Sequence, residues 1–245
     1  MSEPIEQRVV DNDHPWLGLS AFTEATKSFF YGREREIRDI FLRVREQPLT
    51  VLFGQSGLGK TSLLGAGLIP KLRVEGYRPC LLRLDFEVGS LPLIEQLFVA
   101  FKAILLQSPP QAIERMQCPP AHTLWEAFHH VPSRPADLGK APPVIIFDQF
   151  EEIFTLATSR ERQVEAEELF RQLADLIENR PPQAMQERLL SDRGLAREYD
   201  LGPSPVHVVI TLREDFLSNL EAWKKVMPAL MRNRMALHLL DGPRA

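Results

Sequence analysis

The chain has 245 residues, 44% hydrophobic and 25% charged, with a formal net charge of −4. The apolar fraction is too high for a disordered chain, and the length allows one large domain with a full core. The acidic balance argues against binding to nucleic acid. No apolar run is long enough to span a membrane. The two cysteines make no disulfide framework, so we expect a cytoplasmic protein.

The N-terminal part of the chain precedes the first regular pattern. We expect residues 1–30 to form a lead segment, within which the polar, aperiodic residues 1–15 are mobile. Residues 31–245 then form a single core. This core begins with REREIRDIFLRVRE at 33–46, where apolar residues recur at helical spacing and charged residues fill the opposite face.

Five short apolar segments follow, separated by helical patterns. The predicted strands are 49–53, 80–84, 144–147, 206–211 and 235–240. The predicted helices are 60–73, 91–106, 121–131, 161–179 and 214–232, with an extra helix around 183–199. The proline-rich stretches 107–120 and 132–143 are predicted loops, because proline donates no backbone hydrogen bond.

This alternation of strands and helices predicts an α/β domain with a mainly parallel sheet. VIIF at 144–147 and VHVVI at 206–210 are apolar without alternation, which is typical of strands covered on both faces. We therefore expect three layers, with helices on both sides of the sheet. The helix over 91–106 has a wide apolar face, for which we favour two-sided burial over a docking surface for further domains.

The strongest chemical signal lies between the first predicted strand and the helix after it. It is the octapeptide Gly54, Gln55, Ser56, Gly57, Leu58, Gly59, Lys60 and Thr61, which matches G-x-x-x-x-G-K-[ST] in full. In such a loop, glycines let backbone N–H groups converge on phosphate oxygens at the start of a helix. Lys60 would reach the β- and γ-phosphates, and the Thr61 hydroxyl would bind Mg²⁺. We include the next residue, Ser62, in the predicted nucleotide site.

A second acidic motif follows the buried strand 144–147. Asp148 holds the position of a Walker B aspartate, which binds Mg²⁺ directly or through water. Gln149 comes next, where many related ATPases carry the glutamate that activates water. Acidic residues return at Glu151 and Glu152, where a carboxylate could orient the attacking water as general base. The alternative is that these glutamates only stabilise the first turn of a helix.

A third motif, VHVVITLRED at 206–215, is another buried strand that ends in polar residues. The carboxyl ends of strands surround the ligand in doubly wound sheets. Arg213 lies just past this end, so its guanidinium could meet a γ-phosphate; an ordinary surface position is the alternative. Asp215 is predicted to cap the helix that follows.

Together these motifs resemble the STAND class of P-loop ATPases (signal-transduction ATPases with numerous domains), in particular the bacterial-type novel STAND group. The similarity covers about residues 14–245. It rests on PWLGLSAF at 15–22, FFYGRERE at 29–36, GQSGLGKT at 54–61, VIIFDQFEEIF at 144–154 and VVITLREDFL at 208–217. One departure is Ala21, where the family leads us to expect proline.

The resemblance implies a P-loop NTPase fold of the ASCE type, with a parallel sheet in strand order 5-1-4-3-2. The fourth strand would lie beside the first, and Arg213 would act as a sensor arginine. DQFEE is similar to the D-G-x-D-E pattern of NACHT domains, which also place the catalytic carboxylate downstream, so it supports Glu151 and Glu152. Gly32 and Arg33 resemble an element that packs near adenine in apoptotic ATPases, although they could equally form an ordinary helix-starting turn.

The resemblance also suggests how the core works. STAND proteins normally continue into a helical lid, a winged-helix domain and a sensor array, and many carry an N-terminal effector. None of these is readable here, which suggests an ATPase core whose partners are those missing domains. The implied function is a switch that binds ATP or ADP with Mg²⁺. ADP holds a resting state, ATP promotes homo-oligomers, and slow hydrolysis resets the protein.

Other functions are compatible with parts of the sequence. A nucleotide-stabilised scaffold without meaningful turnover would suit Gln149. A DNA-handling, AAA-like ATPase of the origin-recognition kind also carries a GRE-type segment, but this chain lacks a basic stripe. A small-molecule kinase would need an acceptor pocket or a lid motif, and neither is readable.

Overall fold

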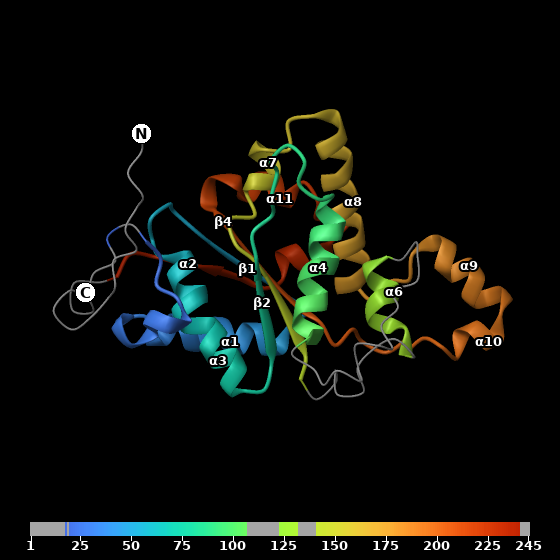
Figure 1. Cartoon of the computed structure of the whole chain (residues 1–245), viewed down its shortest axis with the longest axis horizontal. Coiled ribbons are helices and arrows are strands. Elements are labelled where there is room, and N and C mark those ends of the chain that lie inside the picture. The colour runs from blue at the N-terminus through green and yellow to red at the C-terminus, as the bar shows by residue number, and fades with distance from the viewer. Residues whose placement is uncertain (1–17, 19, 107–122, 132–140, 241–245) are drawn as a thin grey trace.

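The computed structural model of the chain describes residues 18, 20–106, 123–131 and 141–240. Its centre is a five-stranded sheet (Figure 1). The strands are β1 (Leu49–Gly54), β2 (Arg78–Leu82), β3 (Pro143–Phe147), β4 (His207–Arg213) and β5 (Arg234–Ala236). Neighbouring strands are parallel throughout, in the order β2-β3-β4-β1-β5. Read from the other edge, this is 5-1-4-3-2, so the predicted sheet is confirmed.

Helices cover the sheet and form most of its connections. Before β2 the helices are η1 (Glu24–Phe29), α1 (Glu34–Glu46), α2 (Lys60–Ser62), the π-helix η2 (Leu63–Leu68) and α3 (Ile69–Val74). Between β2 and β4 they are α4 (Leu93–Leu106), α6 (Leu124–His129), α7 (Glu152–Thr155), α8 (Arg160–Ile177), α9 (Gln183–Ser191) and α10 (Arg193–Ala196). After β4 they are η4 (Glu214–Phe216), α11 (Leu217–Glu221) and η5 (Pro228–Met231). Three predicted segments lie outside the residues that the structure describes. They are the mobile segment 1–15, the loop 107–120 and most of the loop 132–143.

All five strands differ in extent from the prediction, β1 and β3 by one residue at one end. β2 begins before the predicted segment 80–84, because its ladder with β3 already pairs Arg78 with Pro143. β4 continues to Arg213, since its ladder with β1 runs on to the pair with Gly54. β5 is short and contains only residues that pair with β1. The extension of β4 matters most for function, because it makes Arg213 the last residue of the strand.

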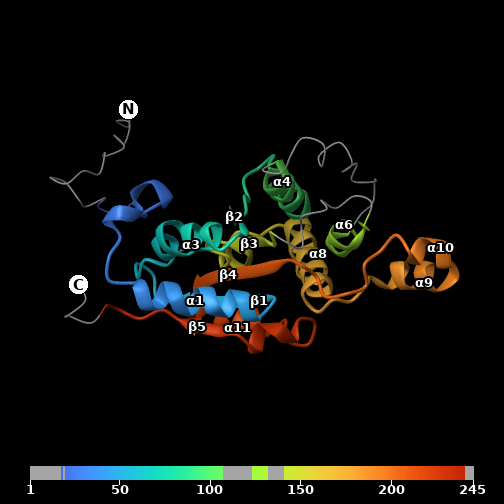
Figure 2. The same cartoon turned by 90° about the horizontal axis from the view of Figure 1, so that it is seen from below.

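Two predicted helices are interrupted. The helix expected over 214–232 is a series of short pieces, of which α11 ends at Glu221. The last piece is separate because Pro228 donates no hydrogen bond and the residue before it, Met227, leaves the helical region with φ −129° and ψ 80°. The helix expected around 183–199 is two helices, α9 and α10. Asp192 lies between them and accepts hydrogen bonds from two backbone N–H groups of α10. Figures 1 and 2 show both helices at one end of the molecule, far from α3.

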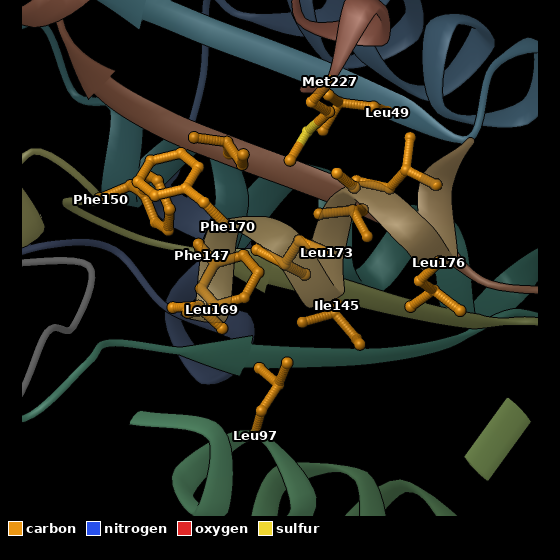
Figure 3. Close-up of a cluster of buried hydrophobic side chains, with 14 of the residues drawn as sticks. Leu49, Leu97, Ile145, Phe147, Phe150, Leu169, Phe170, Leu173, Leu176 and Met227 are labelled. Atoms are coloured by element: carbon orange, nitrogen blue, oxygen red, sulfur yellow. The ribbon is translucent and has the colours of Figure 1, made fainter. Parts of the chain in front are cut away.

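The strands alternate their side chains between two hydrophobic cores. On β3, Val144 and Ile146 belong to the core formed with α1, η2 and α3. Ile145 and Phe147 belong to the core formed with α4, α6, α8 and α11. Figure 3 shows part of this second core, where side chains of α4 and α8 approach those of β3. Burial on both faces is what the unbroken apolar strands predicted.

The wide apolar face of α4 is also explained by burial. Leu93, Leu97 and Phe101 are each at most 1% exposed and belong to the core shared with α8. Val99 points away from that core and is 56% exposed. Within Leu93–Phe101, where the structure describes the side chains, one exposed valine does not make a docking surface, so burial explains this part of the helix. The predicted apolar positions 104 and 105 lie outside the described side chains.

Two glycines let other segments approach the helix that follows the phosphate loop. A Cβ atom on Gly65 would lie 2.8 Å from the carbonyl oxygen of Phe22 in the lead segment. A Cβ atom on Gly67 would lie 2.6 Å from the Ile37 side chain of α1. Both glycines lie in η2, so the helix predicted as regular over 60–73 contains a π-helical segment. The lead segment and α1 therefore pack closer to this helix than a larger residue would allow.

Candidate functional site

The phosphate loop connects β1 to α2 at the carboxyl edge of the sheet. Gly57 and Gly59 have φ values of 80° and 85°, in the left-handed region that favours glycine. Gly54 pairs with Arg213 in the β1–β4 ladder, and a Cβ atom on Gly54 would lie 2.6 Å from the carbonyl oxygen of Leu237. Backbone geometry therefore requires glycine at all three positions of the motif.

Lys60 lies over this loop. Its Nζ donates hydrogen bonds to the carbonyl oxygens of Gly54 and Gln55, both at 2.8 Å. Burial lowers the pKa of Lys60 from its ordinary value, and the negative charge of Glu151 opposes that change. The ammonium group is thus held by neutral oxygens that phosphate oxygens could replace.

A buried hydrogen-bond network joins the phosphate loop to β3 and β4. Asp148 follows β3 directly and is 6% exposed. Its Oδ2 accepts from Thr61 Oγ1 at 2.9 Å, and its Oδ1 accepts from Thr211 Oγ1 at 3.0 Å. The structure therefore brings together the two predicted Mg²⁺ ligands. It adds Thr211, which sequence reasoning missed; a hydroxyl residue that closes an apolar strand was its only signal.

Gln149 and Glu151 follow β3 and line the pocket. Gln149 has a φ of 55°, and its N–H donates to Thr211 Oγ1 at 3.2 Å. The Oε2 atom of Glu151 is buried and has no hydrogen-bond partner among the described residues. Burial raises the pKa of Glu151 above the ordinary glutamate value, and the charge of Lys60 opposes that rise. Glu151 therefore offers an open acceptor whose proton affinity is increased.

The neighbouring Glu152 has a different environment. Arg83, just after β2, donates to both carboxylate oxygens of Glu152, through Nε at 3.0 Å and through Nη2. The Glu152 side chain is 17% exposed. The structure thus distinguishes two glutamates that the sequence left equivalent. Sequence reasoning missed Arg83, although a basic residue within the predicted apolar strand 80–84 could have indicated it.

Arg213 ends β4 and lines the pocket. Its Nε donates to Asp215 Oδ1 at 3.1 Å, and its Nη2 donates to Asp215 Oδ2 at 2.5 Å. Its guanidinium carbon lies 5.5 Å from the centre of the Phe216 ring. The prediction that Asp215 caps the next helix is wrong: Asp215 lies inside η4, whose N-cap residue is Arg213, and its carboxylate binds Arg213.

These elements surround a pocket of about 630 Å³. Four segments line it: Gly18, Ser20, Ala21 and Phe22; Ser56, Gly57, Gly59, Lys60, Thr61 and Ser62; Asp148, Gln149, Glu151, Glu152 and Thr155; Arg213 and Phe216. The lead segment is thus a wall of the pocket, which its sequence alone did not indicate. It is fastened there by a hydrogen bond from Phe22 N to Ser62 Oγ at 3.1 Å.

Gly32 and Arg33 are not among the described residues that line the pocket. Gly32 has a φ of 84°, and α1 starts just after Arg33. Arg33 is 6% exposed, and its guanidinium donates to Leu58 O, His238 O and a carboxylate oxygen of Glu36. Arg33 therefore ties the phosphate loop to the segment after β5, and Gly32 supplies the helix-starting turn.

The donor set fits a magnesium ion bound together with a nucleotide. Thr61 and Asp148 contribute a hydroxyl and a carboxylate that already lie within hydrogen-bond distance of each other. Mg²⁺ is usually held by one or two carboxylates together with substrate phosphates and water. Within the described part of the chain, no cluster of three or more His, Cys, Asp or Glu side chains could hold a metal by itself.

Comparison with known families agrees with this geometry. The model of the family described as Novel STAND NTPase 1 matches residues 15–243, which is almost the whole chain. The chain belongs to this family. The matched region of this novel STAND NTPase contains residues 15–30 of the lead segment, the phosphate loop and the carboxyl ends of β3 and β4. Membership of this NTPase family implies that the chain binds a nucleotide.

Individual relatives of this novel STAND NTPase are distant. The Walker-type ATPase PABY2304 of Pyrococcus abyssi superposes with a TM-score of 0.51 at 18% identity, covering 93% of this chain and 58% of that chain. A HORMA:CdnC:Trip13 complex from E. coli MS115-1 gives a TM-score of 0.40 at 14% identity, covering 85% of this chain and 63% of that chain. The first of these shows a shared fold alone.

A curated relative matches over a shorter stretch. Phosphate import ATP-binding protein PstB 2 of Bacillus licheniformis is 31% identical over 86 residues, which is 30% of this chain and 30% of the relative. The novel STAND NTPase thus spans less than two thirds of the length of each of these three proteins. Where its structure is described, no helix combines the length and the apolar character needed to cross a membrane.

Proposed function

We propose that the chain is the nucleotide switch of a signalling ATPase, in which ADP maintains a resting state and ATP drives self-association. Slow hydrolysis then resets the switch. The observation that carries this proposal is the hydrogen bond of 2.9 Å between Thr61 Oγ1 and Asp148 Oδ2. It brings the phosphate loop and the strand-end carboxylate together, as binding of a magnesium–nucleotide complex requires.

The phosphate loop would bind the β- and γ-phosphates. Backbone N–H groups at the start of α2 and the ammonium of Lys60 supply the positive potential. Lys60 would exchange the carbonyl oxygens of Gly54 and Gln55 for phosphate oxygens, which carry more negative charge. Thr61 and Asp148 would hold Mg²⁺, which neutralises phosphate charge when it is bound.

Glu151 is the proposed general base for the attacking water. Its buried Oε2 atom has no hydrogen-bond partner within the described structure, so it could accept a proton. Burial raises the pKa of its carboxyl group, which brings its basicity closer to the working pH. Glu152 has both oxygens bound to Arg83, and we therefore assign it a positioning role in the turn that carries Glu151.

The proposed sensor of the γ-phosphate is Arg213. It ends β4 level with Gly54, where the phosphate loop begins, and its guanidinium lines the same pocket. A guanidinium offers planar, paired donors that suit a terminal phosphate. A contact made with ATP and not with ADP can shift a conformational equilibrium, whereas a contact made equally with both cannot.

The first experiment measures nucleotide binding by calorimetry with Mg²⁺ present. Wild type should bind both ADP and a non-hydrolysable ATP analogue, and Lys60→Ala should lose most of that binding. Lys71→Ala is the matched control, because Lys71 lies on α3 outside the pocket and pairs with Glu75. Absence of heat with wild type at millimolar nucleotide would refute the proposal. Light scattering with each nucleotide would test self-association.

A nucleotide-stabilised scaffold with negligible turnover is the second candidate. Gln149 favours it, because an amide occupies the position after Asp148 and cannot act as a base. Phosphate release measured over hours separates the two candidates. Turnover that exceeds the spontaneous rate and disappears in Lys60→Ala supports the switch. Tight binding without such turnover supports the scaffold.

A further inference from the structure

Arg213 and Asp215 form a self-contained pair at the rim of the pocket. The two residues lie on either side of Glu214, where β4 passes into η4. The carboxylate of Asp215 occupies one whole edge of the guanidinium, with bonds to Nε at 3.1 Å and to Nη2 at 2.5 Å. Phe216 lies against the same group, 5.5 Å from the guanidinium carbon to the ring centre. The side chain of Arg213 therefore has a defined position before any phosphate engages it.

The pair lies close enough to the phosphate loop to influence it. Arg213 and Phe216 both line the pocket with Lys60. Arg213 also pairs with Gly54, the first residue of the phosphate loop, in the β1–β4 ladder. The Asp215 carboxylate therefore binds a side chain that lines the pocket beside the phosphate loop.

We propose that Asp215 competes with the γ-phosphate for Arg213 and thereby biases the site toward ADP. This inference rests on the proposed function, in which Arg213 contacts the γ-phosphate. A terminal phosphate and the Asp215 carboxylate need the same donors, Nε and Nη2, on one edge of the guanidinium. The incoming phosphate must displace the carboxylate from that edge or face its negative charge. ADP lacks the γ-phosphate, so it meets neither cost.

The exposure of the pair makes this exchange possible. The side chains of Arg213 and Asp215 are 45% and 52% exposed. Ion pairs at such positions contribute little net free energy, because water and salt screen them and two side chains lose freedom. A γ-phosphate with Mg²⁺ nearby can therefore displace the carboxylate, while Asp215 still lowers the affinity for ATP measurably.

The test compares the affinity for a non-hydrolysable ATP analogue with that for ADP in single and double variants. Asp215→Asn should raise the affinity for the ATP analogue by about three- to fivefold, the upper range for an exposed ion pair, and leave that for ADP unchanged. Glu214→Gln is the matched control, because it removes the same charge from the neighbouring exposed residue. In an Arg213→Ala background, Asp215→Asn should have no further effect on the ATP analogue.

Four outcomes are decisive. If wild type binds neither nucleotide, the proposed function itself fails. If wild type binds both and Asp215→Asn leaves the ratio of affinities unchanged, Asp215 does not compete and the inference alone is wrong. If Asp215→Asn lowers the affinity for the ATP analogue, Asp215 positions Arg213 instead of competing for it, and this result also overturns the inference. If Glu214→Gln raises the affinity for the ATP analogue as much as Asp215→Asn does, the gain comes from the loss of any nearby negative charge, and the inference is wrong. A gain in affinity is a readout that a merely damaged fold would not produce.

Discussion

Two groups of side chains at the carboxyl edge of the sheet differ sharply in how they are held. Asp148 and Thr211 are 6% and 0% exposed, and together with Thr61 they form a closed network of hydrogen bonds. Arg213 and Asp215 lie at the end of the same strand as Thr211, yet their side chains are about half exposed. One group is part of the interior, and the other lies in contact with solvent.

The difference teaches which contacts can change with the nucleotide. Breaking a buried network leaves desolvated polar atoms without partners, which costs about 1–3 kcal/mol for each group. Breaking an exposed ion pair costs about 0–1 kcal/mol. We therefore expect Asp148 and Thr211 to form a constant frame in every nucleotide state, and Arg213 to exchange partners between states.

The largest expected effect concerns Glu151, which lines the same pocket as Asp148 and Arg213. Removal of a general base lowers turnover by about 10²–10⁴-fold, and Glu151→Gln should do so while nucleotide binding persists. Glu152→Gln is the control, with a smaller decrease, because Arg83 already occupies that carboxylate. Phosphate release at saturating ATP measures both. An equal decrease in the two variants would contradict the assignment of Glu151 as the base.

The buried network is tested by Thr211→Val, which keeps the shape and removes the hydroxyl. This change deprives Asp148 Oδ1 of a donor and the N–H of Gln149 of an acceptor. The free energy of unfolding in urea should fall by about 1–3 kcal/mol, and magnesium-dependent binding of ATP should weaken. Thr50→Val is the matched control: Thr50 is also 0% exposed and accepts a hydrogen bond from Asn233 Nδ2. The Thr50→Val variant should also have a lower free energy of unfolding, but it should still bind nucleotide.

The exposed group is tested by Arg213→Ala. Loss of a charge-assisted hydrogen bond to the γ-phosphate should weaken ATP-analogue binding by about tenfold, with ADP almost unaffected. Both affinities are measured on the same preparation. An equal loss for the two nucleotides would make Arg213 a structural residue like Thr211 and would remove the contrast between the two groups. Unchanged affinities for both would place Arg213 away from the bound nucleotide.

The smallest expected effect is a shift in the pH profile of turnover. Burial raises the pKa of Glu151 above the ordinary glutamate value of 4.5. A base acts only when deprotonated, so turnover should fall as the pH drops through that raised pKa, earlier than an exposed glutamate would allow. The residual turnover of Glu151→Gln should lack this inflection. A wild-type profile with its acid inflection at the ordinary glutamate value would contradict the buried environment.

The conformation of the phosphate loop and the buried strands could be predicted from short stretches of contiguous residues. The glycines at 57 and 59 each satisfy a local backbone requirement, and apolar runs without alternation correctly indicated strands covered on both faces. The resemblance to STAND ATPases added the strand order, which periodicity cannot specify because it carries no information on which strands pair. The continuity of the last long helix was wrong: α11 ends at Glu221, and Pro228 starts a separate short helix.

Only the tertiary structure decided which partner each functional side chain has. Thr61 meets Asp148 from 87 positions away, and Arg83 meets Glu152 from 69 positions away. The second contact separates the roles of Glu151 and Glu152, which stand side by side in the sequence. Backbone conformation is set largely by neighbours in the chain, so a short motif determines it. Side-chain partners, burial and pKa depend on segments that folding brings together, so they follow from the packed sheet.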